Sequence, residues 1–314
     1  ILMKRQDRLL RVAYPLLVAG AELCGKATAP NYGFILHDQA FYADALGEEY
    51  AEIASRYYHL DTQVAVRYVH PASPAAAAGL RPGDHVLAIN GQSLEGRDVE
   101  EAKRIIQDAI RSASTPLPPL LLRIEREGEK IDLTVPGVLA CKYTVQLINH
   151  DAVNAFADGN GVGITTGMIR FAETDEELAL VVGHEIAHNA LGHLRKRAGN
   201  YFLGTFLDIL LAITLGVNTQ GLFGALAGQA FSQAFEAEAD YAGLYIVARA
   251  GYDITNAANF WRRMAVEHPG SIEENFTATH PSTPERFLAI EQTIQEIEAK
   301  RRQGKPLLPE EKER

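Results

Sequence analysis

The segment GHEIAHNALGH, residues 183–193, restricts the possible folds more than any other part of the chain. It is preceded by TDEE at residues 174–177, a capping box that predicts the start of a helix running through the segment. At about 100° per residue, His184 and His188 lie on one face of this helix, one turn apart. Two imidazoles so placed can bind one metal ion, and Glu185 beside them can reach a water molecule at that ion. Taken alone, the pattern also suits an ordinary amphipathic helix with two surface histidines.

The third histidine of the segment behaves differently. His193 follows His184 by nine residues, about 900° around the helix, which puts it half a turn away from the predicted metal face. We therefore interpret it as a packing or surface histidine near the helix end and not as a ligand. A further ligand has to come from elsewhere in the chain.

A second segment, FEAEADYAGL at residues 235–244, offers that ligand. No Gly or Pro interrupts residues 231–242, so a helix is expected there. Glu236 and Asp240 share one face of it, whereas Glu238 points about 200° away. Glu236 can supply a third zinc ligand, and Asp240 can accept the N–H from the far nitrogen of a ligating histidine. Two histidines and one glutamate leave a fourth position open for water, as a catalytic zinc requires.

The chemistry expected of such a site is hydrolysis. Zinc lowers the pKa of its water towards about 7 and polarises a scissile carbonyl. Glu185 can take the proton as the water attacks and pass it to the leaving amine. The resulting oxyanion needs a further hydrogen-bond donor, for which His280 in ATHPSTPERF is the candidate. The alternative for His280 is an ordinary loop histidine.

Three segments, HEIAH, EAEAD and THPSTPER, occur in an order and at separations that resemble the HtpX- and BepA-type zinc metallopeptidases of the gluzincin clan. The resemblance covers essentially all of the chain outside a β-rich segment described below. It implies one zinc ion per chain, bound by His184, His188 and Glu236. It also implies that Glu185 is the catalytic acid and base, and that the fold is of the zincin type.

The same resemblance extends to residues around the site. It implies that His280 lies beside the metal, where it aids the transition state or blocks the open position, and Arg286 matches the arginine that follows this histidine. NAFADGNGVGITTGMI resembles the strand beside the active site of this family, along which a substrate would bind as an added strand. An ordinary hairpin ahead of the helix is the alternative. The residues of this predicted substrate strand are Gly161, Val162, Gly163 and Ile164.

Residues 62–136 change from long helical patterns to short strands separated by turn signals such as Asn-Gly. SPAAAAGL, RPGD and VLAINGQ within them resemble an HtrA-like PDZ domain. The resemblance implies a groove between a strand at residues 64–68 and a helix at residues 98–110. A peptide or a protein C-terminus would add there as an extra strand. A rigid spacer or lid without a ligand is the alternative.

Together these patterns predict an α+β protein of two domains. Residues 1–61 and 137–314 are expected to form a mainly helical metallopeptidase domain with a small sheet. The β-rich PDZ-like domain of residues 62–136 is expected to be inserted into it, as surface loops with neighbouring ends allow.

Composition excludes some classes of function. The 314 residues are 47% hydrophobic and 22% charged, as in folded globular proteins. A formal net charge of −10, without a stripe of Lys and Arg, argues against a nucleic-acid groove. Cys24 and Cys141 can be two buried thiols or one disulfide that clamps the domain junction, and the sequence leaves this open.

Two apolar stretches raise the question of membranes. The basic residues before VAYPLLVAGA faintly resemble a signal peptide, but Leu9, Val12 and Leu16 recur at near-helical spacing and favour an amphipathic helix. The run at residues 201–217 is at the lower limit for a membrane span and contains Asp208. Together with a weaker apolar run at residues 221–231, we expect it to form a helical hairpin that covers the active site, with peripheral membrane contact as the alternative.

The leading hypothesis is therefore a zinc-dependent endopeptidase that acts on unfolded or damaged polypeptides in the bacterial periplasm or cell envelope. The substrate and the location follow from the resemblance and not from individual residues. A latent or inactive metallopeptidase that serves as a peptide-binding adaptor or chaperone is the alternative. An aminopeptidase would need a group that holds a free N-terminus, and the sequence identifies none.

Overall fold

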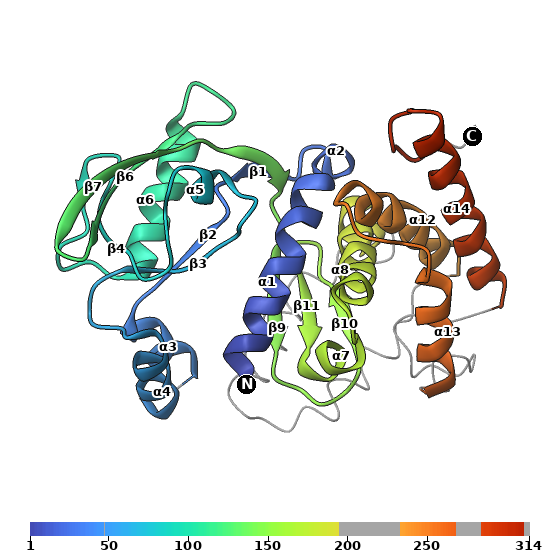
Figure 1. Cartoon of the computed structure of the whole chain (residues 1–314), viewed down its shortest axis with the longest axis horizontal. Helices are drawn as coiled ribbons and strands as arrows, with labels where there is room; N and C mark the ends of the chain where they lie inside the picture. The colour runs from blue at the N-terminus through green and yellow to red at the C-terminus, as the bar shows by residue number, and fades with distance from the viewer. Residues whose placement is uncertain (47, 195–232, 268–283, 311–314) are drawn as a thin grey trace. The chain divides into compact units, whose positions relative to one another are not determined.

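A computed structural model describes residues 1–46, 48–194, 233–267 and 284–310. The chain divides into two units, shown in Figure 1. The helical unit comprises residues 1–27 and 141–314, and the sheet unit comprises residues 28–140. The mixture of helices and strands confirms the predicted α+β class.

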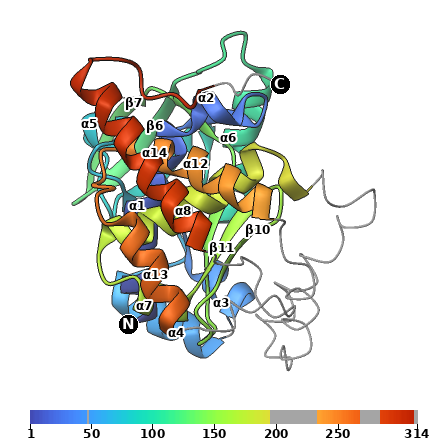
Figure 2. The ribbon, with the colours of Figure 1, turned by 90° about the vertical axis from the view of Figure 1, so that its right-hand side faces the viewer.

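The described helices of the helical unit are arranged around α8. They are α1 (Leu2–Ala19), α2 (Ala21–Cys24), α7 (Thr166–Phe171), α8 (Asp175–Ala190), α12 (Gln233–Arg249), α13 (Ala257–Glu267) and α14 (Pro284–Arg302). The strands of this unit are β9 (Thr144–Ile148), β10 (Ala155–Ala157) and β11 (Gly161–Thr165). Both ribbon views show α8 flanked by α1 and α12 (Figures 1 and 2). Because α8 is buried continuously from Leu178 to Asn189, it forms the centre of the unit.

The start of α8 is fixed by its own capping residues and by α1. The Thr174 hydroxyl accepts a hydrogen bond from the Glu177 N–H at 3.2 Å, as expected for an N-cap. Arg8 and Arg11 of α1 bind the Asp175 carboxylate at 2.9 and 2.7 Å. The opposite face of α1 is buried, including Leu9, Val12 and Leu16, which confirms the predicted amphipathic helix. α1 therefore packs along α8, and its Arg8 and Arg11 bind the first turn of α8.

The sheet unit is built around one antiparallel sheet. Its strands in spatial order are β2 (Phe34–His37), β3 (Ala65–Val69), β4 (His85–Ile89), β6 (Leu120–Arg126) and β7 (Glu129–Val135), with β5 (Gln92–Ser93) on β4. A separate pair joins β1 (Thr28–Asn31) to β8 (Val138–Cys141). The helices of this unit are α3 (Gln39–Leu46), α4 (Glu48–Tyr58), α5 (Pro74–Ala77) and α6 (Val99–Ser112). The buried side of α6, with Val99, Ala102 and Ile105, belongs to the same apolar core as the inner faces of the strands.

Two tight turns of the sheet follow the predicted pattern. Asn90 and Gly91 have φ of 48° and 80° between β4 and β5, and Glu127 and Gly128 have φ of 52° and 82° between β6 and β7. Two consecutive positive φ values are what a two-residue hairpin turn requires, because they match the twist of the flanking strands.

The sheet unit is longer than the predicted insertion of residues 62–136. It begins at Thr28, because β2 pairs with β3 and β1 pairs with β8. Both early strands precede the helical pair α3 and α4, which separates them from the remainder of the sheet in sequence. The structure thus places the unit boundaries at residues 27/28 and 140/141.

A disulfide joins Cys24 to Cys141, which answers the question that the sequence left open. Beside it, the Lys142 N–H donates to the Ala27 carbonyl at 3.0 Å. Both bonds lie where the chain leaves the helical unit and returns to it. The two ends of the intervening segment are therefore held together within the helical unit.

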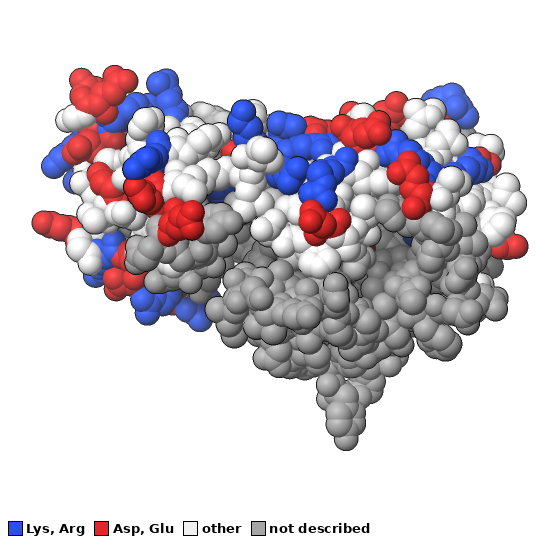
Figure 3. All heavy atoms as spheres, turned by 90° about the horizontal axis from the view of Figure 1, so that it is seen from below, with Lys and Arg blue, Asp and Glu red and all other residues white. Residues whose placement is uncertain are grey.

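Charged residues are mixed on the surface. In Figure 3, acidic and basic side chains are interspersed over the described part of the face, without an extended basic stripe there. None of the described helices is long and apolar enough to cross a membrane. The apolar run at residues 201–217, for which we predicted a helical hairpin, lies outside the described residues.

Candidate metal centre

Two histidines of α8 and one glutamate of α12 form a buried cluster in the helical unit. His184 Nε2 lies 3.0 Å from His188 Nε2, and the carboxylate oxygens of Glu236 lie 3.5 and 3.3 Å from these two nitrogens. Each residue offers one ligand atom, and these atoms lie within 4.8 Å of one another. The three side chains are at most 2% exposed. The donor set, two imidazoles and a carboxylate, is the one that catalytic zinc sites use, so these residues fit a metal ion.

Two glycines allow the helices that carry these ligands to approach closely. A Cβ on Gly243 of α12 would lie 3.0 Å from the backbone N and Cα of His184. A Cβ on Gly183 of α8 would lie 2.7 Å from a methyl group of Val247. A contact of 2.7 Å is shorter than real Cβ atoms show, and one of 3.0 Å is tighter than nearly all of them, so the two glycines let the helices approach closely where they cross. The sequence motifs did not identify these two residues, although two glycines within buried helices are a signal of close packing.

Asp240 of α12 and Arg286 of α14 contact the ligand side chains of the cluster. Asp240 Oδ1 lies 2.9 Å from His184 Nδ1, and the sequence predicts such a contact between Asp240 and one of the ligating histidines. Arg286 binds the other oxygen of Asp240 at 2.5 Å and Glu236 at 3.0 Å. The Trp261 ring covers the guanidinium at 4.7 Å. One buried arginine thus holds both carboxylates in place.

These contacts set the charges of the cluster. Burial favours a neutral imidazole, but hydrogen bonds to Asp240 and Glu236 outweigh it and raise the pKa of His184 to about 9. Burial likewise opposes ionisation of Asp240, yet the Arg286 guanidinium and His184 lower the pKa of this carboxyl. Asp240 and Glu236 in turn raise the pKa of Arg286 against the effect of burial. The carboxylates therefore favour positive charge at the imidazoles, which a metal cation would supply.

The other predicted catalytic residues fall in two places. Glu185 is 2% exposed and lies beside His184 on α8, outside the set of three ligand atoms. His280, the predicted oxyanion donor, lies outside the described residues. Among the described residues, the cluster that could hold a metal contains no fourth protein ligand.

His193 is not part of the ligand cluster, and of the two predicted alternatives, a packing or a surface histidine, it is the packing one. It is fully buried, and its Nδ1 lies 3.0 Å from Nδ1 of His188. Helical geometry fails to place it because α8 ends at Ala190, and Gly192, with φ of 66°, turns the chain. The signal was in the sequence, since a glycine just after a helix commonly ends it in this conformation.

The predicted substrate strand needs a correction. β11 carries all four predicted residues, Gly161 to Ile164, but it is the middle strand of its sheet, paired with β10 on one side and β9 on the other. A substrate cannot add along a strand whose two edges are already paired. Gly163 is needed for packing inside the sheet, because a Cβ at this position would lie 2.5 Å from the Phe156 ring and 2.7 Å from the Ile148 side chain.

β10 is an edge strand of this sheet: it pairs with β11 on one side, and among the described strands its other side has no partner strand. It contacts α8. Asn189 at the end of α8 also holds the turn between the two strands: its amide donates to the Gly161 carbonyl at 2.7 Å and accepts from the Gly159 N–H at 2.7 Å. The sheet is thereby fixed relative to the metal-binding helix.

The groove predicted between a strand at residues 64–68 and a helix at residues 98–110 lies beside a different strand in the structure. β3, which contains most of residues 64–68, pairs with both β2 and β4, so it has no free edge. β2 is the edge strand next to β3, and a hollow of about 250 Å³ lies between it and α6. Phe34 and Leu36 of β2 and Ile106 and Ile110 of α6 are among the residues that line this hollow.

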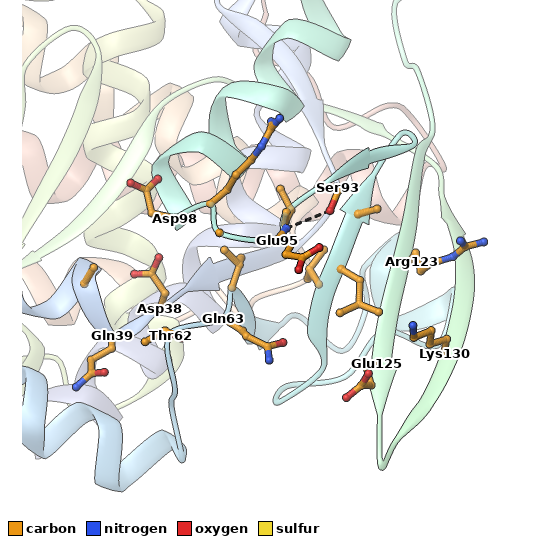
Figure 4. Close-up of a pocket in the computed structure, with 18 of the residues that line it drawn as sticks. Asp38, Gln39, Thr62, Gln63, Ser93, Glu95, Asp98, Arg123, Glu125 and Lys130 are labelled. Carbon is orange, nitrogen blue, oxygen red and sulfur yellow. Dashed lines mark hydrogen bonds between the residues drawn. The ribbon is translucent and has the colours of Figure 1, made fainter.

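A larger hollow of about 1000 Å³ lies elsewhere in the sheet unit and is shown in Figure 4. Two of its labelled carboxylates, those of Asp38 and Asp98, have structural partners. Asp38 accepts the Val99 N–H at 2.7 Å and the Phe41 N–H at 2.8 Å, and Asp98 caps α6. Arg123 at its rim is paired with Asp132 at 2.7 Å. These contacts hold loops and helix ends, and they give no catalytic arrangement.

Comparison with known proteins gives two family matches. The model of peptidase family M48 matches residues 122–294, more than half of the chain, and a PDZ-domain model matches residues 66–113. The mitochondrial metalloendopeptidase OMA1 of Schizosaccharomyces pombe is 28% identical over 233 residues, which are 69% of this chain and 68% of that protein. Human mitochondrial OMA1 is 30% identical over 177 residues, 51% of this chain and 34% of that protein.

A bacterial relative and a solved structure complete the comparison. The beta-barrel assembly-enhancing protease of Yersinia pestis is 33% identical over 211 residues, 61% of this chain and 43% of that protein. The matched part is thus less than half of the human and Yersinia relatives. The crystal structure of the HtrA3 PDZ domain bound to a phage-derived ligand matches 36% of this chain and 88% of that chain at 19% identity. Its TM-score of 0.25 is too low to carry an argument.

Proposed function

The chain belongs to peptidase family M48, and we propose that it is a zinc-dependent endopeptidase whose metal ligands are His184, His188 and Glu236. The observation that carries the proposal is the buried cluster of their ligand atoms, all within 4.8 Å, with Glu185 next to it in sequence. The donor set provides three protein ligands, and a catalytic zinc needs a fourth position open for water.

The side chains of the helical unit have distinct tasks in the proposed reaction. A zinc ion held by the three ligands would supply a Lewis acid and lower the pKa of water at the site. Glu185 accepts the proton of the attacking water and delivers it to the leaving amine. Asp240 accepts the Nδ1–H of His184, which keeps the lone pair of Nε2 directed at the ligand cluster.

Two further groups stabilise the site in this proposal. Arg286 binds both Asp240 and Glu236, and it lowers the pKa of the Asp240 carboxyl, which favours the ionised form in a buried place. His280 is proposed as a hydrogen-bond donor to the developing oxyanion, on the basis of the resemblance in its sequence segment alone.

We propose that a polypeptide substrate adds to β10 and not to β11. Extended peptides bind exposed sheet edges through main-chain hydrogen bonds, and among the described strands β10 offers such an edge beside α8. Binding of this kind requires an unfolded stretch of chain, which supports unfolded or damaged polypeptides as the substrate class. The name of the Yersinia relative, an assembly-enhancing protease, is in keeping with substrates of the cell envelope.

The proposed location is the bacterial periplasm or envelope. The Cys24–Cys141 disulfide supports it, because disulfides persist in oxidising compartments and are rare in the cytosol. Peripheral contact with a membrane is a separate proposal, which binding of the protein to lipid vesicles would test.

Removing the metal tests the proposed function. Treatment with a zinc chelator is expected to abolish cleavage of unfolded casein, and stoichiometric zinc should restore it, because Glu185 alone cannot polarise the scissile carbonyl. The measurement is the rate of casein cleavage before chelation, after chelation and after zinc is returned. Zinc-loaded protein that binds casein without cleaving it would favour the adaptor or latent form instead.

For the sheet unit we propose binding of a peptide C-terminus between β2 and α6. The PDZ-family match and the apolar hollow of about 250 Å³ at the edge strand support it. The carbonyls of Tyr32 and Gly33 are already engaged by Ala75 and His70, so the free edge of β2 begins at Phe34. The apolar lining predicts peptides that end in an apolar residue.

Displayed random peptides with free C-termini test this groove. Wild type is expected to enrich apolar terminal residues, and Ile106→Asp should lower binding of the enriched peptides at least about tenfold, because it buries a charge in the groove. Leu121→Asp is the matched control, since Leu121 is 54% exposed and does not line the hollow. Equal binding by the Ile106 and Leu121 variants would place the peptide elsewhere.

A further inference from the structure

Both histidine ligands have a polar partner at the nitrogen that faces away from the cluster. For His184 this partner is the carboxylate of Asp240. For His188 it is another imidazole, that of His193, with 3.0 Å between the two Nδ1 atoms. His193 in turn lies 3.2 Å from the Glu238 carboxylate through its Nε2. The series of side-chain contacts Glu238–His193–His188 therefore ends at the proposed metal. The shorter pair Asp240–His184 ends there too.

The hydrogen-bond partners determine which ring nitrogen of His188 and of His193 carries the proton. A ligating Nε2 of His188 carries no proton, so the neutral ring bears its proton on Nδ1. That N–H can only be donated if Nδ1 of His193 is an acceptor, which places the proton of His193 on Nε2. The Glu238 carboxylate accepts a hydrogen bond from this Nε2–H. The arrangement is self-consistent, with one donor and one acceptor at each of the two contacts.

The surroundings of His193 hold the ring in this position. It is fully buried, and the Phe235 ring stacks on it at 4.5 Å with an angle of 10° between the planes. Gly192 brings the chain back towards α8 directly before it. Glu238 is 44% exposed, so water can partly replace it as the acceptor.

We propose that His193 is a positioning residue for the metal ligand His188, and that Glu238 selects the tautomer of His193 that can do this. The inference rests on the proposed function in one respect, namely that His188 binds the metal. Hydrogen bonds to the far nitrogen of a ligating histidine orient its ring and raise its basicity, and their loss typically weakens metal binding by about 10- to 100-fold. Both residues act on metal affinity before any substrate is present.

The test is zinc affinity, measured by competition with a fluorescent chelator. His193→Phe keeps an aromatic ring beside Phe235 but offers no acceptor, and it is expected to weaken zinc binding by about 10- to 100-fold. His193→Asn can place an amide oxygen where Nδ1 lies, and it should stay within about threefold of wild type. Thermal unfolding of the metal-free forms shows whether each variant is folded.

A measurement on the wild type does not depend on the folding of any variant. Long-range ¹H–¹⁵N spectra of the histidines distinguish the two neutral tautomers, and zinc-loaded protein should show His193 protonated at Nε2. A proton on Nδ1 of His193, or zinc binding by folded His193→Phe as tight as that of wild type, would overturn this inference while leaving the proposed function intact. A wild type that binds no zinc would instead remove the proposed function.

Discussion

Glu185→Gln is expected to lower the rate of peptide hydrolysis by about 10²- to 10⁴-fold while zinc remains bound. The amide is nearly the same size as the carboxylate but cannot accept a proton from water, and general acid–base catalysis contributes about this much to such reactions. Zinc should be retained because Glu185 is outside the set of ligand atoms in the structure. The rate of casein cleavage and the zinc content of the same samples are the two measurements.

Glu176→Gln is the matched control for this variant. It makes the same chemical change in the first turn of α8, more than two turns away from the ligands. Its cleavage rate should be close to that of wild type. If zinc-loaded Glu185→Gln cleaved casein as fast as the control, Glu185 would not be the acid and base of the reaction.

Arg286→Met is expected to destabilise the metal-free protein by about 3–5 kcal/mol. The methionine fills part of the same space but leaves Asp240 and Glu236 buried without their cation, and removing one partner of a buried ion pair has this magnitude. Arg286 and both carboxylates have side chains that are at most 5% exposed, so water cannot take over the role of the guanidinium. The free energy of unfolding in urea, measured without metal, is the quantity to compare.

Arg262→Met provides the control on a neighbouring helix. Its guanidinium pairs with Glu291, but the two side chains are 39% and 43% exposed, and pairs of this kind contribute about 0–1 kcal/mol. Similar losses in the two variants would show that the buried carboxylates do not depend on Arg286.

The residues of the candidate site that could be predicted from sequence are those whose relation is local. His184 with His188, and Glu236 with Asp240, are each four residues apart on one helix, so the geometry of the helix alone puts each pair on one face. The hairpin turn at Asn90 and Gly91 was predictable for the same reason, since two residues determine it.

What the sequence did not reveal depends on contacts between distant segments. β2 pairs with β3 across the helices α3 and α4, so neither the start of the sheet unit nor its edge strand could be recognised from a continuous pattern. The middle position of β11 follows from its pairing with β9, which no local signal encodes.

His193 was correctly predicted as a packing histidine outside the ligand set, but its position beside His188 was not predicted, for a different reason. Its predicted position assumed that α8 continues to residue 193, whereas the helix ends at Ala190 and the chain turns at Gly192. A helical angle has no meaning beyond the last helical residue. Gly192 is the signal that the helical angle does not extend to His193. Glu238, which points away from Glu236 and Asp240 on its helix, is the partner of His193.

The most direct test of the metal centre is anomalous diffraction from crystals of the zinc-loaded protein, recorded above the zinc absorption edge. We expect one strong peak per chain, within coordination distance of His184 Nε2, His188 Nε2 and a carboxylate oxygen of Glu236. A zinc-loaded crystal without a peak at these three side chains, or with its peak at other residues, would contradict the assignment of this cluster as the metal site.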